Sequence, residues 1–541
     1  MIVVTHTLVI AIFAALCYGT GRAPTARLPA ADGALAFGVG FCAFAQVLFV
    51  LALCGVLTRI AVIVVLAVML ALLVERRPPR PPVSREGRRP GAVAAPLVAV
   101  LPFLRALYPP TAYDSTMYHL PFARMFAEGG GFVYADNLRF PVFPQLNEIV
   151  FSAALLVSDD LTAQLTQWLC FVAVAFAIGA VIDGPRAWLA MAIWFAVPPV
   201  NQAACVAHVE CGLALAVTLA FVAWLRWRET DHRGWLFLVG VFAGMAAATK
   251  YHGLFFVAFF GIALLVLRKF RAVALYVLGV LVVAAPWYLR IAALTGNPVF
   301  PYFGANDWGL SLSASVQAAD YYNPPELREW IYRNFFINVR PWILALIPFA
   351  AFGAYVDKRL RILFLGALSY ILVCWRLESR FLIIVIPLLA VCAAAAIPQR
   401  VKKTWIVIAS ILLILPVTRW NWRTLHYEGP LVRTSAQRDA YLTRKLWPYA
   451  ALRSIDATRT VYVLDGENAT YYARGRFLGN WFGPYRFPRV LPYLQQPDQL
   501  ARVLRSFGAQ YFVVRPDAGF TPSAAFELVR ADPRSLTYRL R

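Results

Sequence analysis

The sequence predicts a polytopic α-helical membrane protein with a small α/β domain at its C-terminal end. Of its 541 residues, 60% are hydrophobic and 15% are charged, and the mean hydropathy is +0.63. A soluble domain averages about 25% charged residues. Long uncharged runs recur along the chain, and many approach the roughly 20 residues that a bilayer helix needs. After about residue 455 the pattern changes to short strands.

The uncharged runs predict about fourteen membrane spans. The first begins with Met-Ile-Val-Val-Thr-His and lacks a basic region, so we interpret it as a retained span and not a cleaved signal. The predicted spans are 1–20, 33–57, 60–75, 91–107, 161–182, 187–200, 205–225, 234–249, 253–268, 272–292, 338–356, 362–376, 381–398 and 404–418.

Basic residues set the expected orientation. With these spans, every short basic loop falls on one side of the membrane, which the positive-inside rule makes cytoplasmic. The longest of these loops, 75–90, is also rich in proline. Much of the net charge of +23 lies in such loops, so it gives little support to a nucleic-acid partner. The segments 108–160 and 293–337 and the tail from 419 lie on the outer side.

The outer segment 108–160 predicts two short helices, at about 115–128 and 145–158, separated by three glycines at 129–131. We expect these amphipathic helices to lie flat at the membrane interface.

The tail predicts a strand at 460–464, a helix at 497–507, and a second strand at 510–514. Two further strands are expected near 525–530 and 535–540. The arginines of the tail favour anionic lipid headgroups, a phosphate-bearing substrate, or a solvated basic surface.

Several motifs are missing from the sequence. It has no HExxH, no Cys pair with zinc spacing, no P-loop and no GxGxxG. The eight cysteines fall in or at the ends of apolar spans, so we expect no disulfides. The sequence specifies no cofactor, and a divalent metal stays an open alternative that no motif supports.

Acidic and basic side chains gather at the outer ends of five separate spans. Ionisable groups in or beside membrane spans are costly and mark candidate functional sites. The candidates are Asp114, Tyr118, His119, His208, Glu210, Lys250, Tyr251, His252, Arg290, Glu378 and Arg380.

Two acids are the leading candidates for catalytic residues. Asp114 is the candidate general base, since a carboxylate within hydrogen-bond reach of a hydroxyl can remove its proton. The competing reading makes Asp114 the N-cap of helix 115–128. Glu210 is a second acid, a metal ligand, a group that orients the acceptor, or an ion-pair partner of Lys250 or Arg290.

The cations Lys250, Arg290 and Arg380 fit a phosphate or diphosphate at the membrane surface, where arginine offers a bidentate fork and lysine a point charge. The alternative is snorkelling to lipid headgroups.

Four motifs in order resemble the GT-C glycosyltransferases, particularly bacterial members similar to protein O-mannosyltransferases and aminoarabinose transferases. Asp114 with Tyr118-His119-Leu120-Pro121 resembles the acidic motif of their first outer loop. The run from Gly240 to Tyr251 resembles their G…GxA…TKY helix end. The other two are Pro286-Trp287-Tyr288-Leu289-Arg290 with 295–301, and Glu378-Ser379-Arg380-Phe381 with Pro387.

This resemblance implies a domain plan and an activity. Residues 91–420 would form the GT-C-like catalytic domain, 1–90 extra N-terminal helices with a basic loop, and 421–541 a soluble α/β domain on the non-cytoplasmic face. The activity would be transfer of a sugar from a polyprenyl-phosphate carrier to an acceptor, at the outer face of the bacterial inner membrane. The acceptor would be a glycolipid, a polysaccharide or a protein.

The resemblance also implies roles for residues. Asp114 would be the base of an inverting attack, and Lys250 and Arg380 would hold the carrier phosphate. Relatives often have Asp-Glu where this chain has Asp114-Ser115, and Glu210 falls where many have an Asp. The competing class is a lipid-linked-sugar transporter, which would show a polar path between the two faces.

Overall fold

The computed structural model describes residues 2–75, 98–138, 140–303, 337–480 and 486–541. The predicted basic loop from residue 76 on, the start of span 91–107 and most of segment 293–337 lie outside the described residues. The chain divides into two compact units. We call Met1–Tyr108, Pro144–Leu289 and Asn323–Pro430 the helical unit, and Pro109–Phe143, Arg290–Tyr322 and Leu431–Arg541 the sheet unit.

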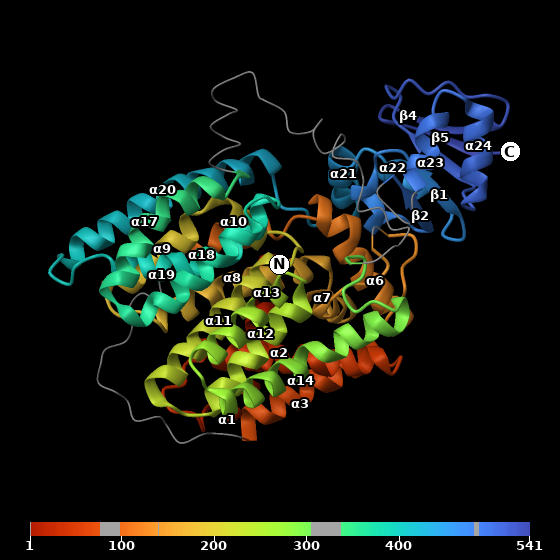
Figure 1. The fold of residues 1–541 in the computed structure, drawn as a ribbon. Coiled ribbons are helices and arrows are strands. Elements are labelled where there is room, and N and C mark those ends of the chain that lie inside the picture. Colours follow the sequence, from red (N-terminus) through yellow and green to blue (C-terminus); the bar gives the residue numbers. More distant parts are fainter. Residues whose placement is uncertain (1, 76–97, 139, 304–336, 481–485) are drawn as a thin grey trace. The chain divides into compact units, whose positions relative to one another are not determined.

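The helical unit follows the predicted order of apolar segments (Figure 1). Most helix bounds lie within a few residues of the predicted spans, because polar residues end each apolar run. The helices are α1 Ile2–Thr25, α2 Gly33–Leu53, α3 Arg59–Glu75, α5 Val100–Arg105, α7 Leu146–Val157, α8 Asp160–Gly179, α9 Pro185–Ala196, α10 Pro198–Ala204, α11 Glu210–Thr230, α12 Gly234–Thr249, α13 Gly253–Val266, α14 Phe270–Thr295, α17 Arg340–Val356, α18 Arg361–Cys374, α19 Ile386–Ala395 and α20 Lys403–Glu428.

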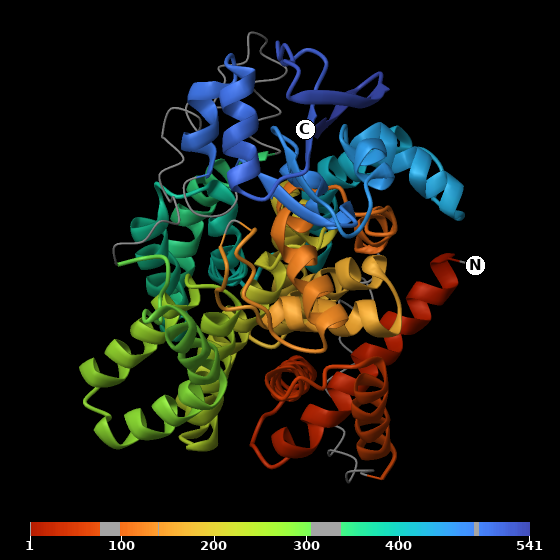
Figure 2. The same ribbon diagram turned by 90° about the vertical axis from the view of Figure 1, so that its right-hand side faces the viewer.

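Six of the described helices are long and apolar enough to cross a membrane: α1, α2, α8, α11, α14 and α20. Shorter apolar helices of 10–17 residues account for other predicted spans. The chain is thus a multi-pass membrane protein, while the count of about fourteen spans stays a prediction. The N-terminal helices α1, α2 and α3, red in Figures 1 and 2, pack on one another.

Close helix packing supports the end of α12, where Lys250 follows. A Cβ on Gly240 of α12 would lie 2.0 Å from the carbonyl oxygen of Tyr276 on α14, and one on Gly279 would lie 2.2 Å from that of Phe237. Glycine at both positions therefore lets the two backbones approach, as small residues do between membrane helices.

Helix α7 differs from the expectation of an interfacial helix. Its residues Leu146–Ala154 are all buried, and it packs against α8, α2, α3 and α12. Apart from Ser152, the residues from Ile149 to Ala154 are apolar and lie on every side of the helix. Burial therefore removes more of this apolar surface from water than a position at the membrane interface would.

The sheet unit contains a five-stranded sheet in the order β2-β1-β3-β5-β4. Strand β1 pairs in parallel with β2 and β3, and β5 pairs antiparallel with β3 and β4. The strands are β1 Thr460–Val463, β2 Arg476–Gly479, β3 Tyr511–Val514, β4 Phe526–Asp532 and β5 Ser535–Leu540. The helices are α6 Leu120–Gly129, α21 Ser435–Lys445, α22 Tyr449–Ser454, α23 Arg486–Val490 and α24 Pro497–Ser506.

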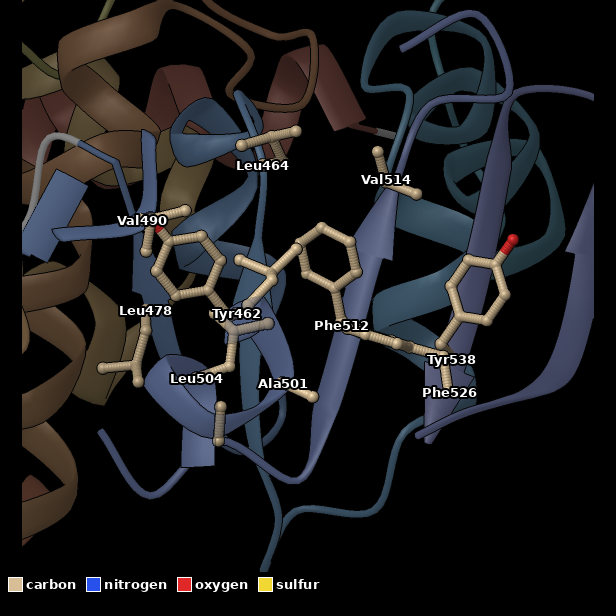
Figure 3. Close-up of a cluster of buried hydrophobic side chains, with 12 residues drawn as sticks. Tyr462, Leu464, Leu478, Val490, Ala501, Leu504, Phe512, Val514, Phe526 and Tyr538 are labelled. Carbon is tan, nitrogen blue, oxygen red and sulfur yellow. The ribbon is translucent and has the colours of Figure 1, made fainter. Parts of the chain in front are cut away.

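One core holds the sheet together. Tyr462 of β1, Phe512 of β3 and Tyr538 of β5 are buried with Ala501 and Leu504 of α24 (Figure 3). The four predicted strands and the predicted helix 497–507 are confirmed. Strand β2 was not predicted, since its four residues directly follow Gly475 and end with a second glycine, Gly479. Helix α20 continues to Glu428, ten residues past the predicted end of its span.

Candidate functional site

Asp114 lies at the start of a widened helical turn in the sheet unit. Ser115–His119 form a π-helical turn, and the amide of Leu120 donates to the carbonyl of Ser115. Pro121 explains the widening, because its ring has no N–H and clashes with the carbonyl four residues earlier in an α-helix. Such π turns are rare and occur frequently at functional sites.

The Asp114 carboxylate does not act as a helix cap. Its backbone is already helical (φ −67°), and its side chain accepts no cap hydrogen bond. Instead it accepts a hydrogen bond from the Tyr118 hydroxyl at 3.1 Å, and Asp114 is only 7% exposed. The buried His119 ring lies 4.1 Å from that of Tyr118, measured between centroids. The sheet unit therefore brings these three predicted residues together.

The C-terminal part of the sheet unit holds this turn in place. The turn packs on Glu467–Tyr472, the 3-10 segment that follows β1. The Thr116 hydroxyl donates to the carbonyl of Asn468 at 2.5 Å, and the Tyr472 hydroxyl donates to that of Pro110 at 2.6 Å. Arg124 of α6 donates to the carbonyl of Ala473 at 3.1 Å. The candidate base thus rests on the C-terminal domain.

Arg290 lies inside the protein and does not extend toward lipid headgroups. It is 9% exposed, donates to the carbonyl of Val133 at 3.0 Å, and stacks over the Phe132 ring at 4.2 Å. These contacts place Arg290 with the loop that follows α6, within the sheet unit.

In the helical unit, Glu210 begins α11 and pairs with Lys250, which follows α12. The Lys250 Nζ lies 3.2 Å from Glu210 Oε1, and His208 Nδ1 lies 3.7 Å from Oε2. The Glu210 side chain is only 3% exposed, and the amide of Val209 donates to its Oε2. Of the alternatives for Glu210, the structure thus contains the ion pair with Lys250.

Three basic side chains surround the ring of Phe381. The Lys250 Nζ lies 4.1 Å from the ring centroid, the Arg380 guanidinium 5.3 Å, and the His252 imidazole 4.6 Å. Arg380 also forms a 2.9 Å ion pair with Glu378. Burial lowers the pKa of His252 to about 3, helped by the positive charges of Lys250 and Arg380. His252 is therefore a neutral member of this cluster at ordinary pH.

Tyr251 lies beside the same cluster. Its ring is edge-on to that of Tyr288 on α14, with centroids 6.0 Å apart, and the Tyr288 hydroxyl donates to the carbonyl of Ala247. The helical unit thus brings together seven of the predicted residues: His208, Glu210, Lys250, Tyr251, His252, Glu378 and Arg380.

A buried relay of hydrogen bonds, which we did not predict, supports the Glu210–Lys250 pair. The amide of Gly212 donates to Gln167 Oε1, Gln167 Nε2 donates to Asn147 Oδ1 at 2.9 Å, and Asn147 Nδ2 donates to the Thr249 hydroxyl at 3.2 Å. Gly212 lies two residues after Glu210, and Thr249 directly precedes Lys250. The signal in the sequence was an amide inside an apolar span, which needs a partner there.

Within the part of the chain that the structure describes, no group of three or more His, Cys, Asp or Glu could hold a metal ion. The eight cysteines are free thiols, and all but Cys54 are buried.

Comparison with known sequences gives a match to one family model and to one curated relative. A family model described as SF2091/S2213 matches residues 437–533. The uncharacterized protein SF2093/S2215 of Shigella flexneri is 38% identical over 79 residues, which are 15% of this chain. The chain spans 40% of the length of that relative.

Solved structures match most of the chain. ArnT from Cupriavidus metallidurans in the apo state has a TM-score of 0.53 at 17% identity, covering 83% of this chain and 96% of ArnT. ArnT bound to undecaprenyl phosphate has a TM-score of 0.51 at 16% identity, covering 84% and 98%. A mutant of the arabinofuranosyltransferase AftD from Mycobacteria has a TM-score of 0.50 at 16% identity, covering 84% and 41%. The predicted fold class is confirmed: this chain has the fold of the GT-C membrane glycosyltransferases.

Proposed function

We propose that this protein is an integral-membrane glycosyltransferase that moves a sugar from a polyprenyl-phosphate carrier to an acceptor, with inversion at the anomeric carbon. The observation that carries the proposal is the grouping of Lys250 and Arg380 around Phe381, with Glu210 beside them. This cation cluster occurs in a chain with the fold of ArnT, which has been solved with undecaprenyl phosphate bound.

The proposed reaction exchanges one bond at the anomeric carbon for another and transfers one proton. The acceptor hydroxyl oxygen attacks the anomeric carbon, the bond from that carbon to the phosphate oxygen breaks, and polyprenyl phosphate leaves. Asp114 takes the hydroxyl proton, since it is a shielded carboxylate held by the Tyr118 hydroxyl. Lys250 and Arg380 stabilise the charge that develops on the leaving phosphate.

Glu210 is proposed to orient Lys250. The amide of Val209 donates to its carboxylate, Lys250 forms an ion pair with it, and His208 Nδ1 lies 3.7 Å from it. Held this way, the ammonium group keeps one geometry before substrate arrives, which lowers the entropy cost of the transition state. Tyr118, His119 and Arg290 of the sheet unit, and His208, Tyr251 and Glu378 of the helical unit, are proposed to bind substrate.

The proposed location is the bacterial inner membrane, with the site on the outer face. This follows from the basic loops, which the positive-inside rule assigns to the cytoplasm. The proposed partners are the lipid-linked donor, membrane lipids and an acceptor.

The test supplies purified protein in detergent with a series of polyprenyl-phosphate sugars and measures free polyprenyl phosphate. We expect release by the wild type and loss of release in Lys250→Gln, with Lys269→Gln as the control on an exposed loop cation. If no donor is cleaved but the protein moves polyprenyl-phosphate sugars across liposome membranes, the transporter class replaces this proposal.

A further inference from the structure

The sheet of the C-terminal domain has a point where its chain order reverses. From β1 the chain passes to β2 on one side, and then through α24 to β3 on the other side of β1. In open α/β sheets, ligands bind outside the carboxyl ends of the parallel strands at such a reversal. The crevice to inspect therefore lies past Val463 of β1 and Val514 of β3.

A cavity of about 330 Å³ lies past the end of β3. Its lining comes from the segment after β3, the β4–β5 turn and the loop before α22: Trp447, Arg515, Pro516, Asp517, Pro533 and Arg534. The end of β1 reaches the same lining, because the Trp447 indole N–H donates to the carbonyl of Asp465 at 3.1 Å. This volume falls within the range of ligand pockets, roughly 300–1,000 Å³.

The backbone after β1 is strained. Asp465 has φ +56°, a left-handed conformation that few residues other than glycine adopt. The Asn480 amide donates to its carboxylate, and the Tyr462 hydroxyl donates to Asn480. Strain that a polar network holds in place is typical of binding sites.

The charges of the cavity favour an anion. Its lining contains two guanidinium groups, Arg515 and Arg534, and one carboxylate, Asp517. Arg534 is fixed by donating to the carbonyls of Thr443 and Arg444. Among the described residues, Arg515 has no acidic partner and stacks on Trp447 at 5.2 Å. By contrast, Arg476, Arg530 and Arg541 of the same unit all pair with carboxylates.

From this geometry we infer that the cavity binds a saccharide that carries a phosphate or carboxylate group. The two guanidinium groups bind the anion, the Asp517 carboxylate accepts hydrogen bonds from sugar hydroxyls, and the two prolines contact the apolar face of the ring. The inference rests on the proposed function, since it makes this site the place where the transferase holds an anionic glycan acceptor.

The position of the turn that contains Asp114 relates this cavity to the proposed reaction. The segment Glu467–Tyr472, on which the turn with Asp114 packs, begins two residues after Asp465. A glycan bound at the carboxyl ends of β1 and β3 therefore binds the same domain that holds the candidate base.

The test is binding without any donor. The full-length protein in detergent is titrated calorimetrically with glucose 1-phosphate, glucuronic acid, glucose and inorganic phosphate. We expect both charged sugars to bind at least about tenfold tighter than glucose and than inorganic phosphate. Arg515→Gln should weaken them about tenfold, equivalent to roughly 1.4 kcal/mol. Arg541→Gln, which removes an exposed and paired arginine, should leave binding unchanged.

Four outcomes overturn the inference: no binding of either charged sugar, equal binding of charged and neutral sugars, wild-type affinity in Arg515→Gln, or equal binding of inorganic phosphate and glucose 1-phosphate. The last of these would mark an unspecific anion site. Asp517→Asn gives a second check, because it should weaken sugar binding while strengthening binding of inorganic phosphate. Since no donor is present, failure here leaves donor cleavage untouched, and failure of donor cleavage leaves this binding measurable.

Discussion

Replacing Asn147 with alanine tests whether the buried relay fixes Lys250. Asn147 is fully buried and joins Gln167 of α8 to Thr249 at the end of α12 through two hydrogen bonds. Its loss removes both bonds and leaves the Gln167 amide without its acceptor.

The size of the effect follows from these two bonds. Side-chain hydrogen bonds between membrane helices are worth about 0.6 kcal/mol on average, and a buried unsatisfied donor costs about 1–3 kcal/mol. We therefore expect Asn147→Ala to lower the free energy of unfolding by about 2–4 kcal/mol. Because Thr249 directly precedes Lys250, we also expect donor cleavage to fall by about tenfold or more, as misplaced catalytic groups do.

The assay combines thermal unfolding in detergent with release of polyprenyl phosphate. Ser152→Ala is the matched control, since Ser152 is a buried polar residue of the same helix whose hydroxyl donates only to the carbonyl of Glu148 within α7. Ser152→Ala should lower the free energy of unfolding by less than about 1 kcal/mol and leave the rate of polyprenyl phosphate release unchanged. A second variant, Thr249→Val, should couple to Asn147→Ala in a double-mutant cycle. Wild-type stability and rate in Asn147→Ala would refute the reasoning.

Three further predictions test other parts of the site. Tyr472→Phe removes the hydrogen bond to Pro110 and should reduce kcat several-fold with little change in KM for the donor. An unchanged kcat would show that this bond does not position the turn that contains Asp114. His252→Asn should reduce the acid sensitivity of Tm: the pKa of folded His252 is about 3, below the usual 6.5, so its contribution to stability is complete above about pH 6.5 and is lost as the pH falls toward 3. Equal loss of Tm between pH 7 and pH 5 in both proteins would contradict that assignment. Treatment with EDTA should leave donor cleavage within about twofold, because the two cations Lys250 and Arg380 serve the leaving phosphate, and a loss restored by a divalent metal would assign that role to the metal instead.

Much of the helical unit was predictable, because apolar runs end where charged residues begin. The end of α12 at Thr249 and the start of α13 at Gly253 were predicted exactly as the structure has them, since Lys250 and His252 interrupt the apolar run. The extension of α20 to Glu428 was not, because Arg419 marks the end of the apolar stretch but not of the helix.

The grouping of side chains was predictable only in part. Span ends place Glu210, Lys250 and Arg380 at similar depths, so their proximity followed from topology. The relay did not, because Asn147 and Thr249 are 102 positions apart and meet through the rotation of two helices, which apolar periodicity leaves undetermined. The packing of the Asp114 turn on the C-terminal residues was not predictable either, because the hydrogen bond from Thr116 to Asn468 joins residues 352 positions apart.

Whether Asp114 is the base of a sugar transfer is decided by comparing the wild type, Asp114→Asn and Glu128→Gln for release of polyprenyl phosphate in the presence of an acceptor. Glu128 is the matched control, since it is an exposed acid on the neighbouring helix α6 whose nearest cation, Arg124, lies 3.8 Å away. We expect that Asp114→Asn folds, melts near the wild-type temperature and loses at least about a hundredfold in rate, as loss of a general base does, while Glu128→Gln keeps its rate. A folded Asp114→Asn with activity within tenfold of the wild type would show that Asp114 is not the base.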